Sequence, residues 1–419
     1  MAFGSRFIPV SLLCLALSAA AGSPPQAAQT ALDEIDAAYR EHGNHLIAVQ
    51  ALRALARRYQ DSPDATHLVF QRLGWHESYV GNETEAVRLF TRHLFGNRLP
   101  SWQAGPPPDG STAMPLRERI AELAGEQQLL LINEAHHVSR HRITTRRLLA
   151  PLHAAGFRYL ALEAMKESGK ALAARGYPVA SSGTYLNDPE FAQLVREALM
   201  LGFTLVEYDP INTYGQERET QQAANIAAIL ERDPEARILV HAGYQHIDET
   251  GLLFGARTMA QLLHEMTGID PLTLNQTTLQ WIGDELEPND VYAAAMKLAG
   301  DIAEPFVLVK DGKPWSVEPG RHDVTVITPP TILHESGRPG WLFEAAGMHA
   351  VRMRVPVGAR LVEARLAGEP REAVPVDRIE IDETDAVTLA LVQGDYRITW
   401  HDASGEAFKE EKLRVSGNR

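Results

Sequence analysis

Five short apolar runs, most of them ending in polar side chains, dominate the middle of the chain. An uninterrupted apolar run indicates a strand buried on both faces, as in parallel α/β sheets. Helical patterns separate several of the runs, and this alternation predicts βαβ units. We therefore expect an α/β domain with a mostly parallel sheet and flanking helices at residues 116–330, in which residues 129–132 and 160–162 are neighbouring parallel strands. The five runs are residues 129–132 (LLLI), 157–163 (FRYLALE), 203–209 (FTLVEYD), 237–241 (RILVH) and 272–276 (LTLNQ).

The segments on either side of this domain have different patterns. Residues 31–99 show only helical spacing and predict α-helical hairpins that resemble tetratricopeptide repeats. A proline- and glycine-rich linker follows at residues 100–115. Residues 345–416 hold short strand-like runs separated by turn residues, which predict a small antiparallel β-sandwich. We expect any protein partner to bind through the helical hairpins or the β-sandwich. The hairpin spacing is carried by Leu73, Gly74, Gly81, Ala86, Phe90 and Leu94.

The N-terminal residues predict export. Arg6 precedes an apolar run at residues 7–17 and small residues at 18–22, which is the pattern of a cleaved signal peptide at residues 1–22. The run is too short for a stable membrane span. Cys14, the only cysteine, lies inside this run, so the mature chain would have no disulfide, thiol nucleophile or cysteine ligand. We expect a periplasmic or secreted protein.

The charge balance disfavours one class of partner. The chain has 40 Lys and Arg against 54 Asp and Glu, a net charge of −14, and no run of basic residues. This disfavours nucleic acid, whose backbone attracts basic surfaces. We expect a small-molecule substrate or ligand instead.

Acids and histidines follow several of the predicted strands. Right-handed crossovers bring the carboxyl ends of parallel strands to one edge of the sheet, where ligands bind in such folds. We therefore expect these side chains to line one crevice. His141 and His153 lie on helical patterns instead, and we expect both at the surface. The candidate residues are Glu134, His136, His137, Glu163, His241 and His246.

These residue types suit a general base acting on water. A carboxylate beside an imidazole fixes its tautomer and raises its basicity. Glu134 can form this pair with His136 or His137, while Glu163 can orient the histidine or act as an acid. Arg218 can bind an anionic group or a developing oxyanion. No G-x-S-x-G elbow is present, so we do not expect a serine hydrolase.

The same side chains leave two other classes open. Carboxylates and imidazoles also bind Mn, Fe, Co or Zn, and their spacing does not decide between the uses because the donors follow separate strands. The favoured hydrolysis needs no cofactor. The alternatives are a haem- or transition-metal-binding periplasmic protein and a non-catalytic scaffold. The candidate metal donors are Glu134, His136, Glu163, His241 and His246.

The order of these motifs resembles the erythromycin esterase and ChaN-like superfamily and, more distantly, the Tiki/TraB proteins. The resemblance covers residues 129–276. It implies one of three activities: lactone hydrolysis by a Glu/His-activated water, haem binding, or metal-dependent proteolysis. The matching pieces are Glu134-Ala135-His136, Leu162-Glu163-Ala164, Arg218-Glu219 and residues 240–246 (VHAGYQH).

The resemblance assigns Glu134 and His136 to the first motif, and it has two departures. Asn133 stands where the family usually has glycine, which can restrict the approach of a ligand to the backbone. The esterase spacing Glu-x-x-His selects His137 as the base, whereas the ChaN-like spacing selects His136. The other positions that it assigns are Glu163, Arg218, and His241 or His246.

Overall fold

The computed structural model describes residues 30–37, 45–59, 63–95, 105–210, 213–253, 255–283 and 289–417. The predicted signal peptide at residues 1–22 and the first part of the predicted linker lie outside these ranges. Among the helices of the described ranges, none combines the length and the apolar character needed to cross a bilayer.

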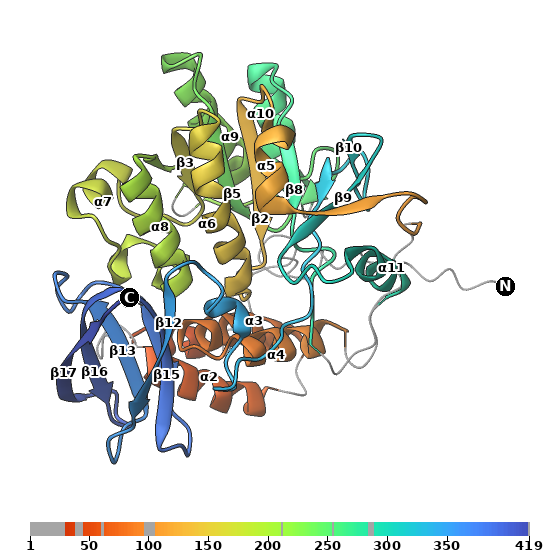
Figure 1. The fold of residues 1–419 in the computed structure, drawn as a ribbon. Coiled ribbons are helices and arrows are strands. Elements are labelled where there is room, and N and C mark those ends of the chain that lie inside the picture. Colours follow the sequence, from red (N-terminus) through yellow and green to blue (C-terminus); the bar gives the residue numbers. More distant parts are fainter. Residues whose placement is uncertain are drawn as a thin grey trace.

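A parallel sheet of six strands forms the centre of the α/β domain (Figure 1). The strand order is β11–β8–β2–β5–β3–β4, and every neighbouring pair is parallel. All residues of β2 and β5 are buried, as expected for apolar strands covered on both faces. The predicted α/β fold is confirmed. The strands are β2 (Leu129–Glu134), β3 (Tyr159–Leu162), β4 (Thr204–Glu207), β5 (Ile238–Gly243), β8 (Leu272–Asn275) and β11 (Val324–Thr325).

The strand order differs from the prediction in one respect. β2 and β3 are not neighbours, because β5 lies between them and its Val240 pairs with Leu131 on one side and Ala161 on the other. The expectation of adjacent strands was wrong because the crossover from β2 to β3 skips one position, which β5 later fills. The end of β5 therefore lies between the ends of β2 and β3.

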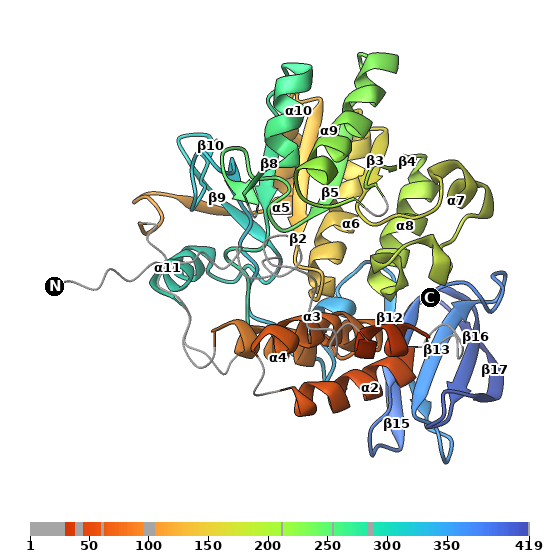
Figure 2. The ribbon, with the colours of Figure 1, turned by 180° about the vertical axis from the view of Figure 1, so that it is seen from behind.

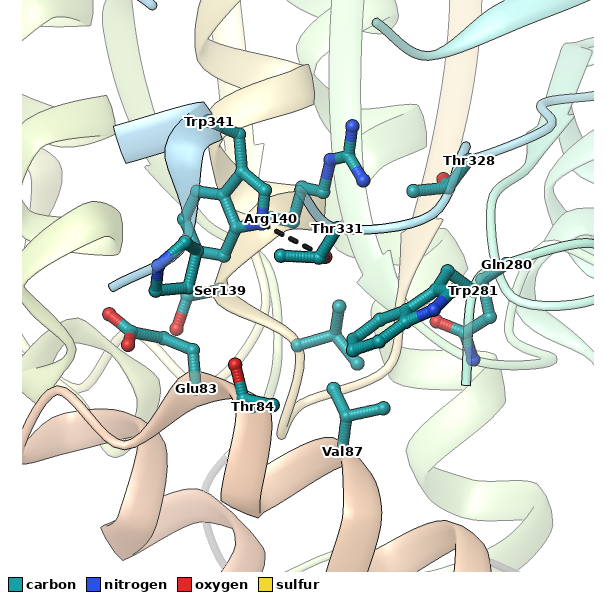
Figure 3. A pocket seen from close by; sticks show the side chains of 12 residues that line it. Glu83, Thr84, Val87, Ser139, Arg140, Gln280, Trp281, Thr328, Thr331 and Trp341 are labelled. Carbon is teal, nitrogen blue, oxygen red and sulfur yellow. Dashed lines mark hydrogen bonds between the residues drawn. The ribbon is translucent and has the colours of Figure 1, made fainter. Parts of the chain in front are cut away.

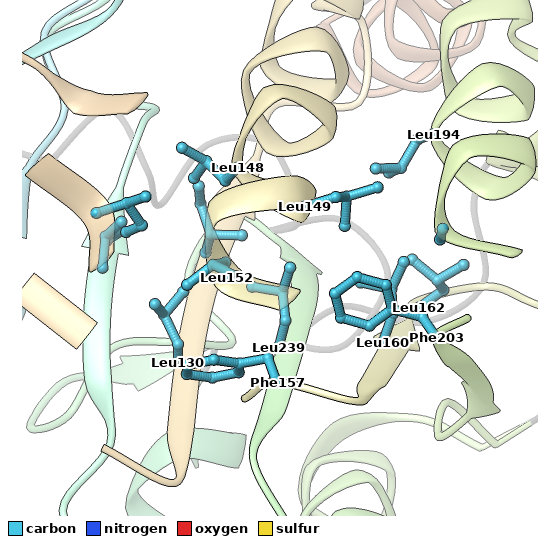
Figure 4. Close-up of a cluster of buried hydrophobic side chains, with 14 of the residues drawn as sticks. Leu130, Leu148, Leu149, Leu152, Phe157, Leu160, Leu162, Leu194, Phe203 and Leu239 are labelled. Atoms are coloured by element: carbon cyan, nitrogen blue, oxygen red, sulfur yellow. The ribbon is translucent and has the colours of Figure 1, made fainter. Parts of the chain in front are cut away.

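Helices cover both faces of the sheet, each over its own apolar core. Leu130 and Ile132 of β2 join the core of one face, whereas Leu129 and Leu131 join that of the other, because successive side chains of a strand point to opposite faces. Figure 4 shows the first core, in which leucines of β2, β3 and β5 meet the helices. Burial of each such side chain stabilises the fold by about 1.5–3 kcal/mol. The first face carries α5 (Leu116–Ala124), α6 (Ser139–Ala154) and α8 (Pro189–Leu201), and the second carries α9 (Gly215–Arg232) and α10 (Met259–Thr267).

A small antiparallel sheet completes the domain. β1 (Thr112–Pro115) pairs with β9 (Phe306–Lys310), which also pairs with β10 (Lys313–Pro314). The linker prediction was therefore wrong for residues 112–115, because their backbone groups pair with a distant strand. The remaining elements of the domain and of the segment after it are α7 (Gly169–Arg175), η2 (Ala180–Ser182), η3 (Tyr185–Asn187), β6 (Leu252–Leu253), β7 (Ala256–Arg257), α11 (Asp290–Ala299) and η4 (Gly340–Leu342).

The predicted N-terminal helices are present and lie across one end of the α/β domain (Figure 2). They share an apolar core that includes Leu46, Val49, Leu52 and Leu73. The last of these helices opens with Glu83 and Glu85, acids that favour a helix N-terminus. The helices are residues 30–37, α2 (His45–Arg58), α3 (Pro63–Tyr79) and α4 (Glu83–Phe95).

The C-terminal residues form the predicted antiparallel sandwich. One sheet has the order β14–β13–β16–β17 and the other pairs β12 with β15, and a single core joins them around Trp400. This sandwich also packs on the N-terminal helices: Leu361 belongs to their core, and the Glu380 amide donates to the Val80 carbonyl at 2.7 Å. The strands are β12 (Met348–Arg354), β13 (Leu361–Leu366), β14 (Asp377–Glu380), β15 (Ala386–Val392), β16 (Gly394–His401) and β17 (Ala407–Val415).

Candidate functional site

The predicted site residues meet where the parallel strands end. Glu134 closes β2, Glu163 follows β3, and His241 lies within β5. His136 Nδ1 lies 2.8 Å from Glu134, and its Nε2 lies 4.0 Å from Glu163. His246 Nε2 lies 3.7 Å from Glu163, and His241 Nε2 lies 3.6 Å from Glu134. The structure therefore brings these five side chains together at one edge of the sheet.

Glu134 and His136 form a hydrogen-bonded pair. Because an ionised carboxylate can only accept, His136 Nδ1–H donates to Glu134 Oε1. In this tautomer Nε2, the nitrogen that faces Glu163, is the position that can accept a proton. Two polar atoms 4.0 Å apart are close enough for one water to bridge.

Arg142, which the sequence analysis missed, fixes the carboxylate of this pair. Its guanidinium is fully buried and donates to both oxygens of Glu134, at 2.8 and 2.9 Å. It also bonds the His136 carbonyl at 2.8 Å and lies 2.7 Å from Asp188. The position of Arg142 in the first turn of the helix after β2 was a sequence signal for this contact. Side chains in that turn point back toward the helix N-terminus, here toward the end of β2.

Glu163 is held in a second cluster of charges. Arg218 donates to it at 2.8 Å and also bonds both oxygens of Asp209, at 2.8 and 2.9 Å. The backbone amide of Gly243 donates to the other Glu163 oxygen. Two carboxylates of the protein therefore occupy Arg218, the residue expected to bind an anion of the substrate. Asp209 ends the third predicted strand, so its acid was visible in the sequence.

His246 connects this second cluster to α9. Its Nδ1 lies 2.7 Å from Glu219 and its Nε2 lies 3.7 Å from Glu163. Burial lowers the pKa of His246, but the two carboxylates outweigh burial and raise it above its ordinary value. The protonated imidazole is thus favoured between two acids.

The carboxylates of the site stay ionised. Burial alone would raise the pKa of Glu163, but His246, His136 and Arg218 together lower it to about 2. Arg142 and His136 likewise overcome burial and hold the pKa of Glu134 well below its usual range.

His241 is the most isolated imidazole of the group. Burial lowers its pKa to about 4, although Glu134 opposes this, so the ring is neutral at pH 7. Its Nε2 has no hydrogen-bond partner among the described residues.

A glycine permits the close approach of the two clusters. A Cβ at Gly243 would lie 2.4 Å from His136 Cε1 and 2.8 Å from Glu163 Oε2. Contacts this short do not occur, so any larger residue would displace the imidazole or the carboxylate. The absence of a side chain at this position lets the end of β5 pass between the ends of β2 and β3.

The remaining histidines are separate from this group. His137 packs on Phe90 of α4, with ring centroids 4.1 Å apart, and its Nδ1 lies 3.4 Å from the Tyr244 hydroxyl. His141 is fully buried, so the expectation of a surface position was wrong; its Nδ1 accepts the Ala135 amide at 3.0 Å and closes the turn between β2 and α6. His153 is half-buried.

Aromatic side chains cover the site. Tyr185 stacks on His136 with ring centroids 3.8 Å apart, and Trp75 of α3 meets the edges of both rings. Tyr244 packs edge-on against the same imidazole. The side chains of Glu134, His136, Glu163, His241 and His246 are therefore only 1–5% exposed. In place of an open crevice, the structure has a polar layer closed by the N-terminal helices and η3.

The donor set does not fit a metal or haem. The oxygens of Glu134 and Glu163 are taken by guanidinium, imidazole and amide donors, and a guanidinium 2.8 Å away would repel a cation. Within the described ranges, no group of three or more His, Cys, Asp or Glu side chains is arranged to hold a metal. The Gly243 backbone and Glu163 lie against His136 Nε2, where haem iron would have to bind.

Comparison with known proteins gives no family. No family model matches the chain, and no curated protein matches it. Among solved structures, the chain is similar to the type III effector HopBA1, with 16% identity, a TM-score of 0.27, and coverage of 42% of this chain and 86% of that one.

Two further structures show comparable likeness. A structure described as bacterial protein toxins has 14% identity, a TM-score of 0.30, and coverage of 60% of this chain and 64% of that chain. RRSP, a MARTX toxin effector domain from Vibrio vulnificus, has 14% identity, a TM-score of 0.27, and coverage of 58% and 54%. The match thus spans less than two thirds of either structure. At these TM-scores the likenesses carry no argument about the activity of this chain.

Proposed function

We propose that this chain is an exported hydrolase of the erythromycin esterase and ChaN-like type, which uses a water molecule activated by Glu134 and His136. The observation that carries the proposal is the 2.8 Å hydrogen bond between His136 Nδ1 and Glu134, with Nε2 left facing Glu163 at 4.0 Å. This arrangement supplies an oriented imidazole beside fixed charges. An ester or lactone is the proposed substrate class.

In the proposed reaction, His136 Nε2 takes a proton from the water as its oxygen attacks the carbonyl carbon. The resulting imidazolium is stabilised by the Glu134 carboxylate and returns the proton to the leaving alkoxide, so the C–O bond breaks and an acid and an alcohol form. The side chain of Arg218 is 21% exposed, more than the Glu163 and Asp209 carboxylates that already bind it, and it is proposed to attract the developing oxyanion in addition to them. Substrate enters when the Trp75 and Tyr185 cover moves.

Purified mature protein assayed on a panel of esters and lactones tests this function. Glu134→Gln and His136→Gln should each lower the rate by about 10²–10⁴-fold, the usual contribution of a general base. His137→Gln is the matched control. Because His137 packs on Phe90, this variant should retain activity. Exhaustive dialysis against a chelator should leave the rate unchanged. Full activity in Glu134→Gln would refute the pair, and loss on chelation with recovery in Mn²⁺ or Zn²⁺ would favour the metal alternative.

A non-catalytic scaffold is the second candidate, favoured by the burial and full pairing of the acids. It predicts that no substrate of the panel is cleaved and that Glu134→Gln changes only the stability of the protein. Cleavage that disappears in Glu134→Gln, with an unchanged far-UV circular dichroism spectrum, would exclude the scaffold.

A further inference from the structure

Two elements distant in sequence carry the aromatic cover of the candidate site, which consists of Trp75 and Tyr185. Trp75 belongs to α3 and Tyr185 opens η3, and their rings meet edge to face with centroids 5.3 Å apart. Tyr185 stacks on the imidazole of His136 at 3.8 Å, and Trp75 meets the same ring at 5.9 Å. The position of this imidazole therefore depends on how α3 and η3 are held against each other.

One side chain of the C-terminal sandwich holds both elements. Arg378 of β14 is 4% exposed, and its Nη1 donates to the Tyr79 carbonyl at 2.8 Å and to the Asn187 carbonyl at 3.2 Å. Tyr79 ends α3, one turn after Trp75. Asn187 ends η3, two positions after Tyr185. A single guanidinium thus bonds the ends of the two elements that carry the cover.

Further contacts orient Arg378 and join the two elements. Glu363 on the neighbouring strand β13 accepts a hydrogen bond from Arg378 Nε at 2.8 Å, which directs the guanidinium toward the two carbonyls. The Tyr79 hydroxyl donates to the carbonyl of Thr184, the residue before η3, at 3.1 Å. A Cβ at Gly81, in the turn after α3, would lie 2.3 Å from the Arg378 carbonyl oxygen, so this turn rests directly on β14.

The cavity beside the cover is too small to serve as an entry. Val87, Trp281 and Ser139 line it between α4 and the start of α6, and it has room for about one water molecule (Figure 3). The side chains of Glu134 and His136 are only 1% and 5% exposed. A substrate therefore reaches the pair only when the cover moves, and the contacts that hold α3 and η3 control that movement.

We propose that Arg378 is a positioning residue of the hydrolytic site, through which the C-terminal sandwich holds the aromatic cover and orients the His136 imidazole. Its guanidinium bonds the backbone of α3 and η3, and these elements hold the rings that pack on the imidazole. The sandwich thereby acts on a site to which it contributes none of the described acids and histidines. The effect on rate rests on the proposed hydrolysis, whereas the effect on the cover can be measured without a substrate.

Labelling of the full mature chain with diethyl pyrocarbonate, followed by peptide mass spectrometry, measures the cover, because this reagent modifies an imidazole nitrogen that it can reach. Arg378→Gln should label at His136 about tenfold faster than the wild type, the effect expected for loss of a charge-assisted hydrogen bond. His322, 4% exposed in the α/β domain, is the internal reference and should label at an unchanged rate. Equal labelling of His136 in both proteins, or equal acceleration at both histidines, would overturn the proposal.

Two further variants keep this test decisive. Tyr79→Phe removes only the hydroxyl that bonds the Thr184 carbonyl and should accelerate labelling of His136 by about threefold. His401→Gln is the matched control, because His401 lies 3.0 Å from the other oxygen of Glu363 while its second nitrogen faces a carbonyl within the sandwich. If Arg378→Gln does not fold, unchanged labelling in Tyr79→Phe overturns the proposal. Acceleration in His401→Gln equal to that in Arg378→Gln does so as well.

Kinetics test the positioning role itself. On a substrate that the wild type cleaves, Arg378→Gln should lower kcat by about tenfold or more with a smaller change in KM, because misplacement of a catalytic group slows the chemical step. An unchanged kcat together with faster labelling of His136 would overturn the positioning role. If the wild type cleaves no ester or lactone of the panel, the hydrolytic function fails, and the labelling still decides whether Arg378 holds the cover.

Discussion

Replacement of Arg142 by methionine is the most direct test of how the site is held together. The guanidinium is fully buried and contacts Glu134, Asp188 and the His136 carbonyl. Methionine keeps an extended apolar side chain but leaves two buried carboxylates without their cation. Breaking a buried ion pair in this way costs about 3–5 kcal/mol of the free energy of unfolding. Urea unfolding followed by circular dichroism measures the loss.

A double-mutant cycle separates the charge interaction from packing. With Glu134→Gln already present, removal of Arg142 leaves only Asp188 uncompensated, so the two losses should fall short of additivity by about 1–3 kcal/mol. Arg147→Met is the control and should cost no more than about 1 kcal/mol, because its 3.4 Å pair is long and its partner Glu344 is 41% exposed. A loss in Arg142→Met equal to that of the control, or strict additivity in the cycle, would refute the reasoning.

Two further predictions concern the second cluster. Gly243→Ala should lower the free energy of unfolding by about 1–3 kcal/mol, because the added methyl group overpacks against His136, and it should abolish hydrolysis. A variant with normal stability in urea and a normal rate in the ester assay would contradict the close approach of Gly243 to His136. Because the folded-state pKa of His246 is raised above 6.5, its stabilising effect is complete below pH 6.5 and is lost as pH rises through the folded value. Melting temperatures between pH 6 and 9 should therefore fall less steeply in Glu219→Gln than in the wild type, and parallel curves would exclude this linkage.

The local pattern of the chain predicts its elements well but not their order in space. The apolar runs at residues 129–132 and 238–241 appear as β2 and β5, because burial on both faces leaves a direct mark on composition. The position of β5 between β2 and β3 is not indicated by the composition of any of these runs. It depends on which strand edge remains free when β5 arrives, and this is a long-range property of pairing.

The same division applies to the site. Glu134, Glu163 and His241 were predictable because strand ends of a parallel sheet meet at one edge. Arg142 was missed although its place in the first turn of α6 directs it back toward β2, because an arginine near the start of a helix looks like a solvated residue until the helix is placed against the sheet. The covering of His136 by Trp75 was equally hidden, since it requires the position of the N-terminal helices on the strand ends.

The packing of the last strands on the first helices has a consequence for how the chain folds. Arg53 bonds Glu380, 327 positions along the chain, and Leu361 fills part of the core of the N-terminal helices. These helices are synthesised before the sandwich, yet their apolar surface is completed only by residues of the sandwich. Contacts at such separation form slowly, and the unfilled surface is open to aggregation in the interval. The N-terminal helices therefore reach their native packing only after the sandwich has been made.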